Sequence, residues 1–142
     1  MCYIARVAAE RTPFSARLDV RVVERLKAAG AREGMSASQV AERFIDEGLR
    51  SEEFPGITFR PGSTGRRAGI IGGPDVWEIV RDLRRARGAG AEDPVALVAS
   101  TSDLGEAQVR LAAAYHAAFP LEIDERIAAE EALLERLLAG AA

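Results

Sequence analysis

Residues 14–49 contain a strand-like run followed by two helix patterns, and this stretch constrains the fold more than any other. Phe14, Ala16 and Leu18 alternate with polar residues, which is the period of a strand with one buried face. A helix pattern follows, with Asp19 as its expected N-cap, and ends near Gly34. Three elements this short bury little apolar surface, and a lone strand leaves its edge without a hydrogen-bonding partner. The stretch therefore predicts pairing with a second copy of the chain.

The second helix of this stretch has a clear start signal. Ser36 and Gln39 have the spacing of a capping box, so the helix is predicted to begin at Ser36. Its apolar residues recur every three or four positions, which predicts one buried face. That face consists of Val40, Phe44, Ile45 and Leu49. Because one strand and two short helices cannot enclose it, we expect the second copy to cover it as well.

Leu18, Gly34 and the Gly-Met-Ser turn that begins at Gly34 carry a resemblance to a known family. In this order and spacing, the stretch resembles the ribbon-helix-helix family of bacterial DNA-binding proteins, which includes CopG-like repressors and many VapB-type antitoxins. In that family, strands from two subunits pair antiparallel and the two-stranded ribbon enters the major groove of DNA. The alternative is an ordinary strand-helix-helix piece of a larger core.

The resemblance implies roles for individual residues. The polar side of the ribbon would contact base edges through Pro13, Ser15 and Arg17. The start of the second helix would hold a DNA phosphate on its free N–H groups, at Ser36, Ala37 and Ser38. The dimer core would consist of Phe14, Ala16, Leu18, Val40 and Phe44.

The rest of the chain is predicted to form a second domain, and the expected fold class is mainly α with short β. Phe54-Pro55-Gly56 marks the boundary, so residues 1–53 form the ribbon-helix-helix module and residues 54–142 the second domain. Two strand-like runs, Ile57–Arg60 and Arg67–Ile71, predict a β-hairpin. Helices are predicted from Asp75 to about Arg87, over 94–101, over 104–119 and over 121–138, and the middle two form a helix-turn-helix candidate. The first has Trp77 at the edge of its predicted apolar stripe, and Asp93 is the expected cap of the second. That stripe consists of Val76, Ile79, Val80 and Leu83.

Residues 54–130 are also similar to a small, uncharacterised bacterial family that combines a hairpin with a helix-turn-helix. The motifs that carry this similarity are Phe-Pro-Gly-Ile, Gly-Gly-Pro-Asp-Val-Trp-Glu and Glu-Ile-Asp-Glu-Arg-Ile. Members of that family commonly accompany PIN-like ribonucleases and are taken to be their antitoxins. The similarity therefore implies a PIN-type ribonuclease toxin as a partner of the second domain.

The last predicted helix is the expected surface for that ribonuclease. VapB-type antitoxins often insert an Arg into the carboxylate cluster with which PIN-type ribonucleases bind Mg²⁺ or Mn²⁺. In this helix only Arg126 and Arg136 could do so, and Arg126 is favoured because apolar residues flank it. Apolar neighbours would anchor it in a groove. The expected partner-binding residues are Ile123, Arg126, Ile127 and Leu134. In the alternative, this helix packs Ile123, Ile127 and Leu134 onto its own domain.

The charges of the chain are unevenly distributed. Residues 1–50 carry nine Lys/Arg against seven Asp/Glu, and residues 51–90 carry seven against five. Residues 91–142 carry three against ten, which brings the formal net charge of the whole chain to −3. The basic part could face DNA phosphates, whereas the acidic end would be repelled by them. This division favours a molecule that binds DNA at one end and a protein at the other, although a solvated acidic helix gives the same count.

Several classes of protein are disfavoured by composition. No apolar run approaches the ~20 residues of a membrane span, and the start lacks a signal-peptide pattern. A single cysteine, Cys2, excludes an internal disulfide and favours a reducing cytoplasm. With one His and one Cys, we expect no metal site and no cofactor. His116 has no Ser or Cys at the spacing of a nucleophile–base pair, so no catalytic residue is predicted.

The sequence therefore predicts a cytoplasmic, homodimeric binding protein rather than an enzyme. The first hypothesis is an antitoxin that inhibits a PIN-type ribonuclease and represses its own operon through ribbon-helix-helix binding to operator DNA. The alternative is a stand-alone transcriptional regulator whose second domain binds an effector or extends the DNA contact. A small catalytic domain fused to a ribbon-helix-helix is a third and more remote hypothesis.

Overall fold

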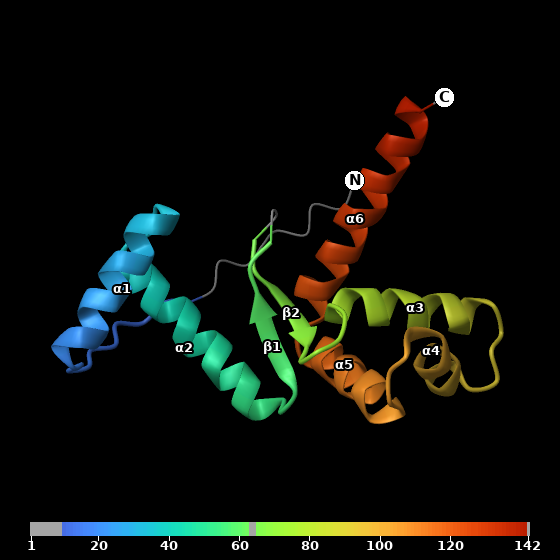
Figure 1. Cartoon of the computed structure of the whole chain (residues 1–142), viewed down its shortest axis with the longest axis horizontal. Coiled ribbons are helices and arrows are strands. Elements are labelled where there is room, and N and C mark those ends of the chain that lie inside the picture. The colour runs from blue at the N-terminus through green and yellow to red at the C-terminus, as the bar shows by residue number, and fades with distance from the viewer. Residues whose placement is uncertain (1–9, 63–64, 142) are drawn as a thin grey trace. The chain divides into compact units, whose positions relative to one another are not determined.

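The computed structural model describes residues 10–62 and 65–141, and these are mainly helical with one small antiparallel sheet (Figure 1). This confirms the predicted class of mainly α with short β. The chain divides into an N-terminal unit, Met1–Arg43, and a C-terminal unit, Phe44–Ala142. The elements are α1 (Val20–Glu33), α2 (Ala37–Glu53), β1 (Ile57–Arg60), β2 (Arg67–Ile70), α3 (Val76–Gly88), α4 (Pro94–Ser102), α5 (Glu106–Ala118) and α6 (Pro120–Gly140).

The boundary between the two units falls inside α2, which is one continuous helix. The predicted end of the ribbon-helix-helix module after residue 53 concerns a different property, namely which part of the chain folds and dimerises by itself. That module boundary stays a prediction.

The turn between α1 and α2 depends on two glycines. Gly34 ends α1 in the left-handed conformation, at φ 67°, where a residue without a Cβ carries no steric penalty. One turn earlier, a Cβ placed on Gly30 would lie 2.3 Å from the carbonyl oxygen of Met35. The N–H of Met35 donates to the carbonyl of Gly30 at 2.9 Å. The close approach of these two backbone segments therefore requires glycine at position 30.

Both helices of this region begin with the caps expected from the sequence. The Asp19 carboxylate accepts a hydrogen bond from the N–H of Arg21 at 2.8 Å. At the start of α2, the Ser36 hydroxyl accepts from the N–H of Gln39 at 3.1 Å, and the Gln39 side chain accepts from the N–H of Ser36 at 2.9 Å. This reciprocal pair is the predicted capping box.

The predicted strand at residues 14–18 is not formed in the single chain. Residues 10–19 have no regular secondary structure. A strand requires a neighbouring strand, and the described residues of the N-terminal unit contain none. Pairing of this segment between two subunits stays a prediction.

The C-terminal unit begins with the predicted hairpin, in which Ile57 pairs with Ile70 and Arg60 with Arg67. Its second strand ends at Ile70, one residue earlier than predicted. The hairpin is joined to the start of α3 by Asp75, a buried carboxylate that lies 2.8 Å from Nε of Arg67. The Arg60 guanidinium donates to the carbonyls of Ile70 and Gly73, both at 2.7 Å.

The core of the C-terminal unit is formed by the hairpin and the buried faces of α3 to α6. The predicted apolar stripe of α3 (Val76, Ile79, Val80 and Leu83) is entirely buried. Trp77 is half-buried and packs against the edge of this core, as predicted, with the Arg81 guanidinium 5.1 Å from its ring centroid. The other buried apolar residues are Ile57, Ala68, Ile70, Ala86, Val98, Ala99, Val109, Ala112, Tyr115, Ile123 and Ile127.

Candidate functional site

The segment before α1 exposes its apolar side chains. Phe14 is 84% exposed and Leu18 52%, and Ala16 is exposed as well. Val20, the first residue of α1, is 67% exposed. Water in contact with such a row of apolar side chains is unfavourable, and a contiguous apolar patch on a folded chain usually marks an interaction surface. Of the residues expected in a dimer core, only Val40 is fully buried within the single chain.

The second half of α2 has two unlike faces. On one face, Phe44, Ile45 and Leu49 are 45%, 55% and 57% exposed. The other face carries Glu47 and Arg50, whose side chains are largely buried and form ion pairs with other residues of the C-terminal unit. Phe44, Ile45 and Leu49 of the predicted apolar stripe are therefore exposed to solvent. The polar face of α2 instead attaches this helix to the rest of the C-terminal unit.

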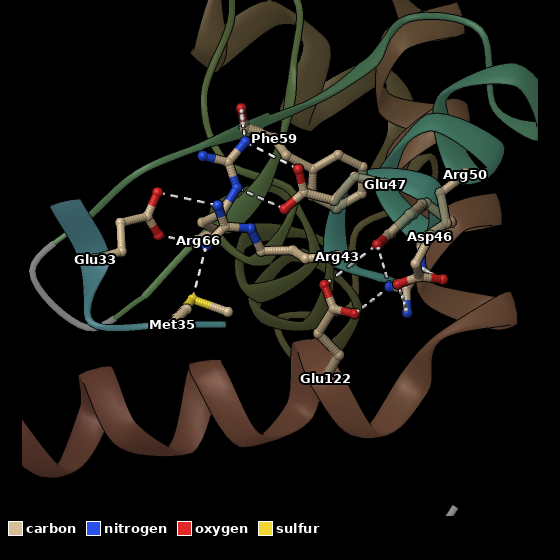
Figure 2. Close-up of polar contacts among 10 residues, drawn as sticks. Glu33, Met35, Arg43, Asp46, Glu47, Arg50, Phe59, Arg66 and Glu122 are labelled. Carbon is tan, nitrogen blue, oxygen red and sulfur yellow. Dashed lines mark hydrogen bonds and ion pairs between the residues drawn. The ribbon is translucent and has the colours of Figure 1, made fainter. Parts of the chain in front are cut away.

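The first attachment of α2 is a bidentate ion pair, which Figure 2 shows among the labelled side chains. The two carboxylate oxygens of Glu47 accept from Nε and Nη2 of Arg66 at 2.5 and 2.9 Å. Nη2 also lies 3.4 Å from the carbonyl oxygen of Phe59. The same guanidinium lies 5.5 Å from the ring centroid of Phe44. Glu47 neutralises the partly buried charge of Arg66, which would be costly to bury on the hairpin without a partner.

The second attachment is centred on Arg50. Its guanidinium donates to the carboxylates of Asp46 and Glu122, at 3.1 and 2.5 Å (Figure 2). It also donates to the Tyr115 hydroxyl at 2.9 Å. It also stacks 3.9 Å from the ring centroid of Phe119. Burial raises the pKa of Tyr115, although Arg50 acts in the opposite direction. Burial alone would lower the pKa of Arg50, but the bonds to Tyr115 and Glu122 outweigh it and raise that pKa.

Sequence reasoning missed both attachments. Arg50 and Glu122 are 72 positions apart, and Glu47 and Arg66 are 19 apart. The only signal in the sequence was the presence of charged residues on the helix face opposite the apolar stripe. That signal does not identify the partner of either residue.

The expected base-contacting residues Pro13, Ser15 and Arg17 are all exposed. Within residues 10–43, Arg17 forms no ion pair. The same is true of three further exposed cations of this stretch, Arg25, Lys27 and Arg32. These charges are available to an anionic ligand, whereas Arg11, Arg21 and Arg43 are paired with Glu42, Asp19 and Glu33.

One part of the expected phosphate site needs correction. The N–H of Ser36 already donates to Gln39, so it is not free to bind a phosphate. The N–H groups of Ala37 and Ser38 are in the first turn of α2, where no intrahelical carbonyl can reach them. The expected site is therefore reduced to these two N–H groups.

The arginines of the C-terminal unit are mostly engaged within it. Among its described residues, only Arg87 and Arg136 lack an ion pair. The predicted helix-turn-helix consists of α4 and α5, and the cation of its second helix, Arg110, is 2.9 Å from Glu106. The unit therefore offers few cations to a phosphate backbone.

The expected partner-binding residues of α6 separate into two groups. Ile123 and Ile127 are 3% and 4% exposed and belong to the core of their own unit, so their assignment as anchors for a partner is wrong. The alternative packing holds for these two residues but not for Leu134, which is 51% exposed. Arg126 lies 3.8 Å from Glu130, one turn along the helix, and its side chain is 17% exposed. Helical periodicity placed these residues on one face but gave no information about where the core ends.

A small polar cluster joins three helices of this unit. Asp124 lies 2.8 Å from Nε2 of His116 and 2.5 Å from Nη2 of Arg84. Burial alone would raise the pKa of Asp124, but the hydrogen bonds from His116 and Arg84 outweigh it and hold that pKa below its usual value. Among the described residues, no three His, Cys, Asp or Glu side chains are grouped as metal ligands. Within the same residues, no helix is both long enough and apolar enough to cross a membrane.

These surfaces define a two-unit helical protein with an uncovered apolar segment, a group of unpaired cations and an acidic second unit. Comparison with protein-family models, curated proteins and solved structures gave no match.

Proposed function

We propose that this protein is a dimeric ribbon-helix-helix repressor that acts as the antitoxin of a PIN-type ribonuclease. The observation that carries the proposal is the exposed apolar row before α1, beside cations without ion pairs. Phe14 is 84% exposed, and Arg17 belongs to the alternating polar set of the same segment. A segment of this kind is suited to pair with its own copy and to present its polar side to DNA.

Pairing of two such segments would solve two physical problems at once. Alternation places Phe14, Ala16 and Leu18 on one side of an extended strand, so two paired strands would bury six apolar side chains together. The backbone N–H and C=O groups of the two segments would also satisfy each other. Arg17, on the opposite side, has the bidentate geometry that recognises O6 and N7 of guanine.

The antitoxin part of the proposal is supported by the C-terminal unit. Most of its arginines are paired internally, while its last helix carries unpaired acids. This charge distribution disfavours a second unit that extends the DNA contact and favours one that binds a cationic protein. A PIN-type ribonuclease is the partner implied by the resemblance of residues 54–130.

A second candidate is a stand-alone regulator whose C-terminal unit binds a small apolar effector. One observation favours it, an open apolar groove of about 390 Å³ in this unit. The groove is lined by Pro55, Gly56, Ile70, Ile71, Ala107, Gln108 and Leu111. In this case the neighbouring reading frame would not encode a nuclease, and DNA affinity would respond to small apolar molecules.

Phe14→Ser provides the test of the shared core. A side chain that is 84% exposed in a monomer changes stability by less than about 0.5 kcal/mol when it is replaced. In the proposed dimer the same change removes a buried aromatic from each subunit, so the variant should be monomeric by sedimentation and should lose operator binding. Leu97→Ser, at a 44% exposed position of the C-terminal unit, is the matched control and should remain dimeric. A monomeric wild-type chain at micromolar concentration would contradict the proposal.

The antitoxin role is tested separately. The chain should co-purify with the PIN-type ribonuclease encoded beside it and should suppress its RNA cleavage in a purified assay. Active ribonuclease in the presence of excess chain would leave only the regulator hypothesis.

A further inference from the structure

The apolar face of α6 continues beyond the core that buries its beginning. Ile123 and Ile127 are buried, and Leu134 follows Ile127 at seven residues, which places it on the same side of the helix two turns later. Beyond that point the apolar residues are uncovered: Leu133, Leu134, Leu137 and Leu138 are 44%, 51%, 62% and 64% exposed. We call these four residues the leucine ridge. Figure 1 shows the end of α6 projecting beyond α3 and α5 of its unit.

The leucine ridge does not contribute to the core of its own unit. Its members are absent from the buried cluster and from the partly buried residues that pack against it. Most of the stability of a protein helix comes from packing of its amphipathic face, and the distal turns of α6 lack this packing. Four leucines side by side on an exposed helix end form the kind of patch that usually binds another molecule.

The charges beside the leucine ridge indicate what that molecule is. Glu131 is three positions before Leu134 and Glu135 three before Leu138, so both border the ridge. Neither glutamate has an ion-pair partner among the described residues, whereas Glu130 is paired with Arg126. Arg136, also exposed and without an ion pair among the described residues, adds one positive charge, so the charged residues beside the ridge are net negative. A second copy of the ridge would bring the same net charge with it, and the resulting repulsion disfavours self-pairing. The charges favour a partner with cationic side chains around an apolar groove.

We infer that the leucine ridge is the docking surface for the ribonuclease. The inference rests on the proposed function and deepens it, because it moves the contact from Arg126 and its neighbours to the exposed end of α6. A nuclease that binds RNA must carry cationic side chains around its substrate site, and Glu131 and Glu135 complement that charge. The leucines supply apolar anchors in an i, i+3, i+4 pattern that suits a groove.

The closing experiment uses the full chain and, as its probe, a catalytically inactive form of the PIN-type ribonuclease encoded beside it. The double variant Leu134→Ser/Leu137→Ser should bind the probe at least ~100-fold more weakly by calorimetry, since central apolar anchors dominate such interfaces. Leu121→Ser is the matched control, because it replaces a 65% exposed leucine in the same helix but outside the ridge. It should bind like wild type. Both variants should keep the wild-type circular dichroism spectrum and operator affinity.

A charge-reversal variant tests the acidic border. Glu131→Lys/Glu135→Lys should slow association with the same probe about tenfold at low salt and by less at high salt. Equal affinity of wild type and the double leucine variant would overturn the docking surface while leaving the antitoxin proposal intact. Failure of the wild-type chain to bind the probe would overturn both. A wild-type assembly larger than a dimer that the leucine changes reduce to a dimer would make the ridge a contact between copies and would also overturn the inference.

Discussion

The N-terminal and C-terminal units handle their apolar residues in opposite ways. In the C-terminal unit, the hairpin and four helices enclose a continuous core in which Tyr115, Ile79 and Leu83 are almost inaccessible to water. In the N-terminal unit, the segment before α1 leaves Phe14 and Leu18 exposed. The C-terminal core is closed within one chain, whereas the described residues of the N-terminal unit leave Phe14 largely uncovered. This contrast is the reason why we propose that the N-terminal segment pairs with a second copy.

The two units also differ in how they use arginine. The C-terminal unit pairs nearly all of its arginines with its own carboxylates, and several of these pairs join elements that are distant in sequence. The N-terminal unit leaves Arg17, Arg25, Lys27 and Arg32 without ion pairs within residues 10–43. Paired arginines stabilise a fold, while unpaired ones are free to neutralise phosphates. The net charge of −3 conceals this difference.

The largest expected effect comes from truncating the closed core. Leu83 is 2% exposed, so Leu83→Ala should lower the free energy of unfolding of the C-terminal unit by about 2–5 kcal/mol. The loss should not depend on protein concentration, because that core is completed by one chain. Urea denaturation followed by circular dichroism at two concentrations gives the value. A concentration-dependent loss would mean that this core is also shared between subunits.

The next effect concerns the unpaired cations and compares one arginine from each unit. Arg17→Ala should remove about 1–3 kcal/mol of discrimination between operator and unrelated DNA, because a bidentate guanine contact would be lost. Arg87→Ala is the control, since Arg87 is also exposed and without an ion pair among the described residues but lies in the C-terminal unit. Fluorescence anisotropy with labelled DNA at fixed salt measures both variants. Equal effects from the two would remove the electrostatic distinction between the units.

The smallest effect is a pH dependence in the C-terminal unit. The lowered pKa of Asp124 means that its ionised form stabilises the folded state above the unfolded pKa of about 3.9, and this contribution is lost as pH falls through the folded pKa. Its side chain is 43% exposed, so solvent screening should keep the contribution within about 1 kcal/mol. Asp124→Asn should therefore be slightly less stable than wild type at pH 7. The two curves of stability against pH should converge as the pH falls through the folded pKa of Asp124, and an offset that stays constant throughout acid titration would exclude this origin.

Local structure could be predicted from the sequence because its signals lie within a few residues. Asp19, Ser36 with Gln39, and Asp93 each begin a helix through the expected hydrogen bonds. The hairpin was also predicted, since a Pro-Gly turn between two short β-type runs has few other solutions. Residues at these caps and turns restrict the backbone dihedral angles directly, so the local structure there depends little on the rest of the fold.

The remaining features depend on distant parts of the chain or on a second molecule. The periodicity of α6 is the same at Ile127 and Leu134, yet one is buried and the other is exposed, because the core of the unit ends between them. The partners of Glu47 and Arg50 follow from the tertiary fold and have no local signal. The predicted strand at residues 14–18 would need a partner strand, and in the described residues of the single chain this segment has no regular secondary structure.

Trp77 gives the protein a built-in optical reporter for one of its two units. It is the single tryptophan of the chain, and it lies at the edge of the C-terminal core. Intrinsic tryptophan emission therefore monitors the surroundings of α3. Unfolding followed by emission should report the C-terminal core alone. A change in emission when operator DNA is added would mean that binding at one unit alters the packing of the other.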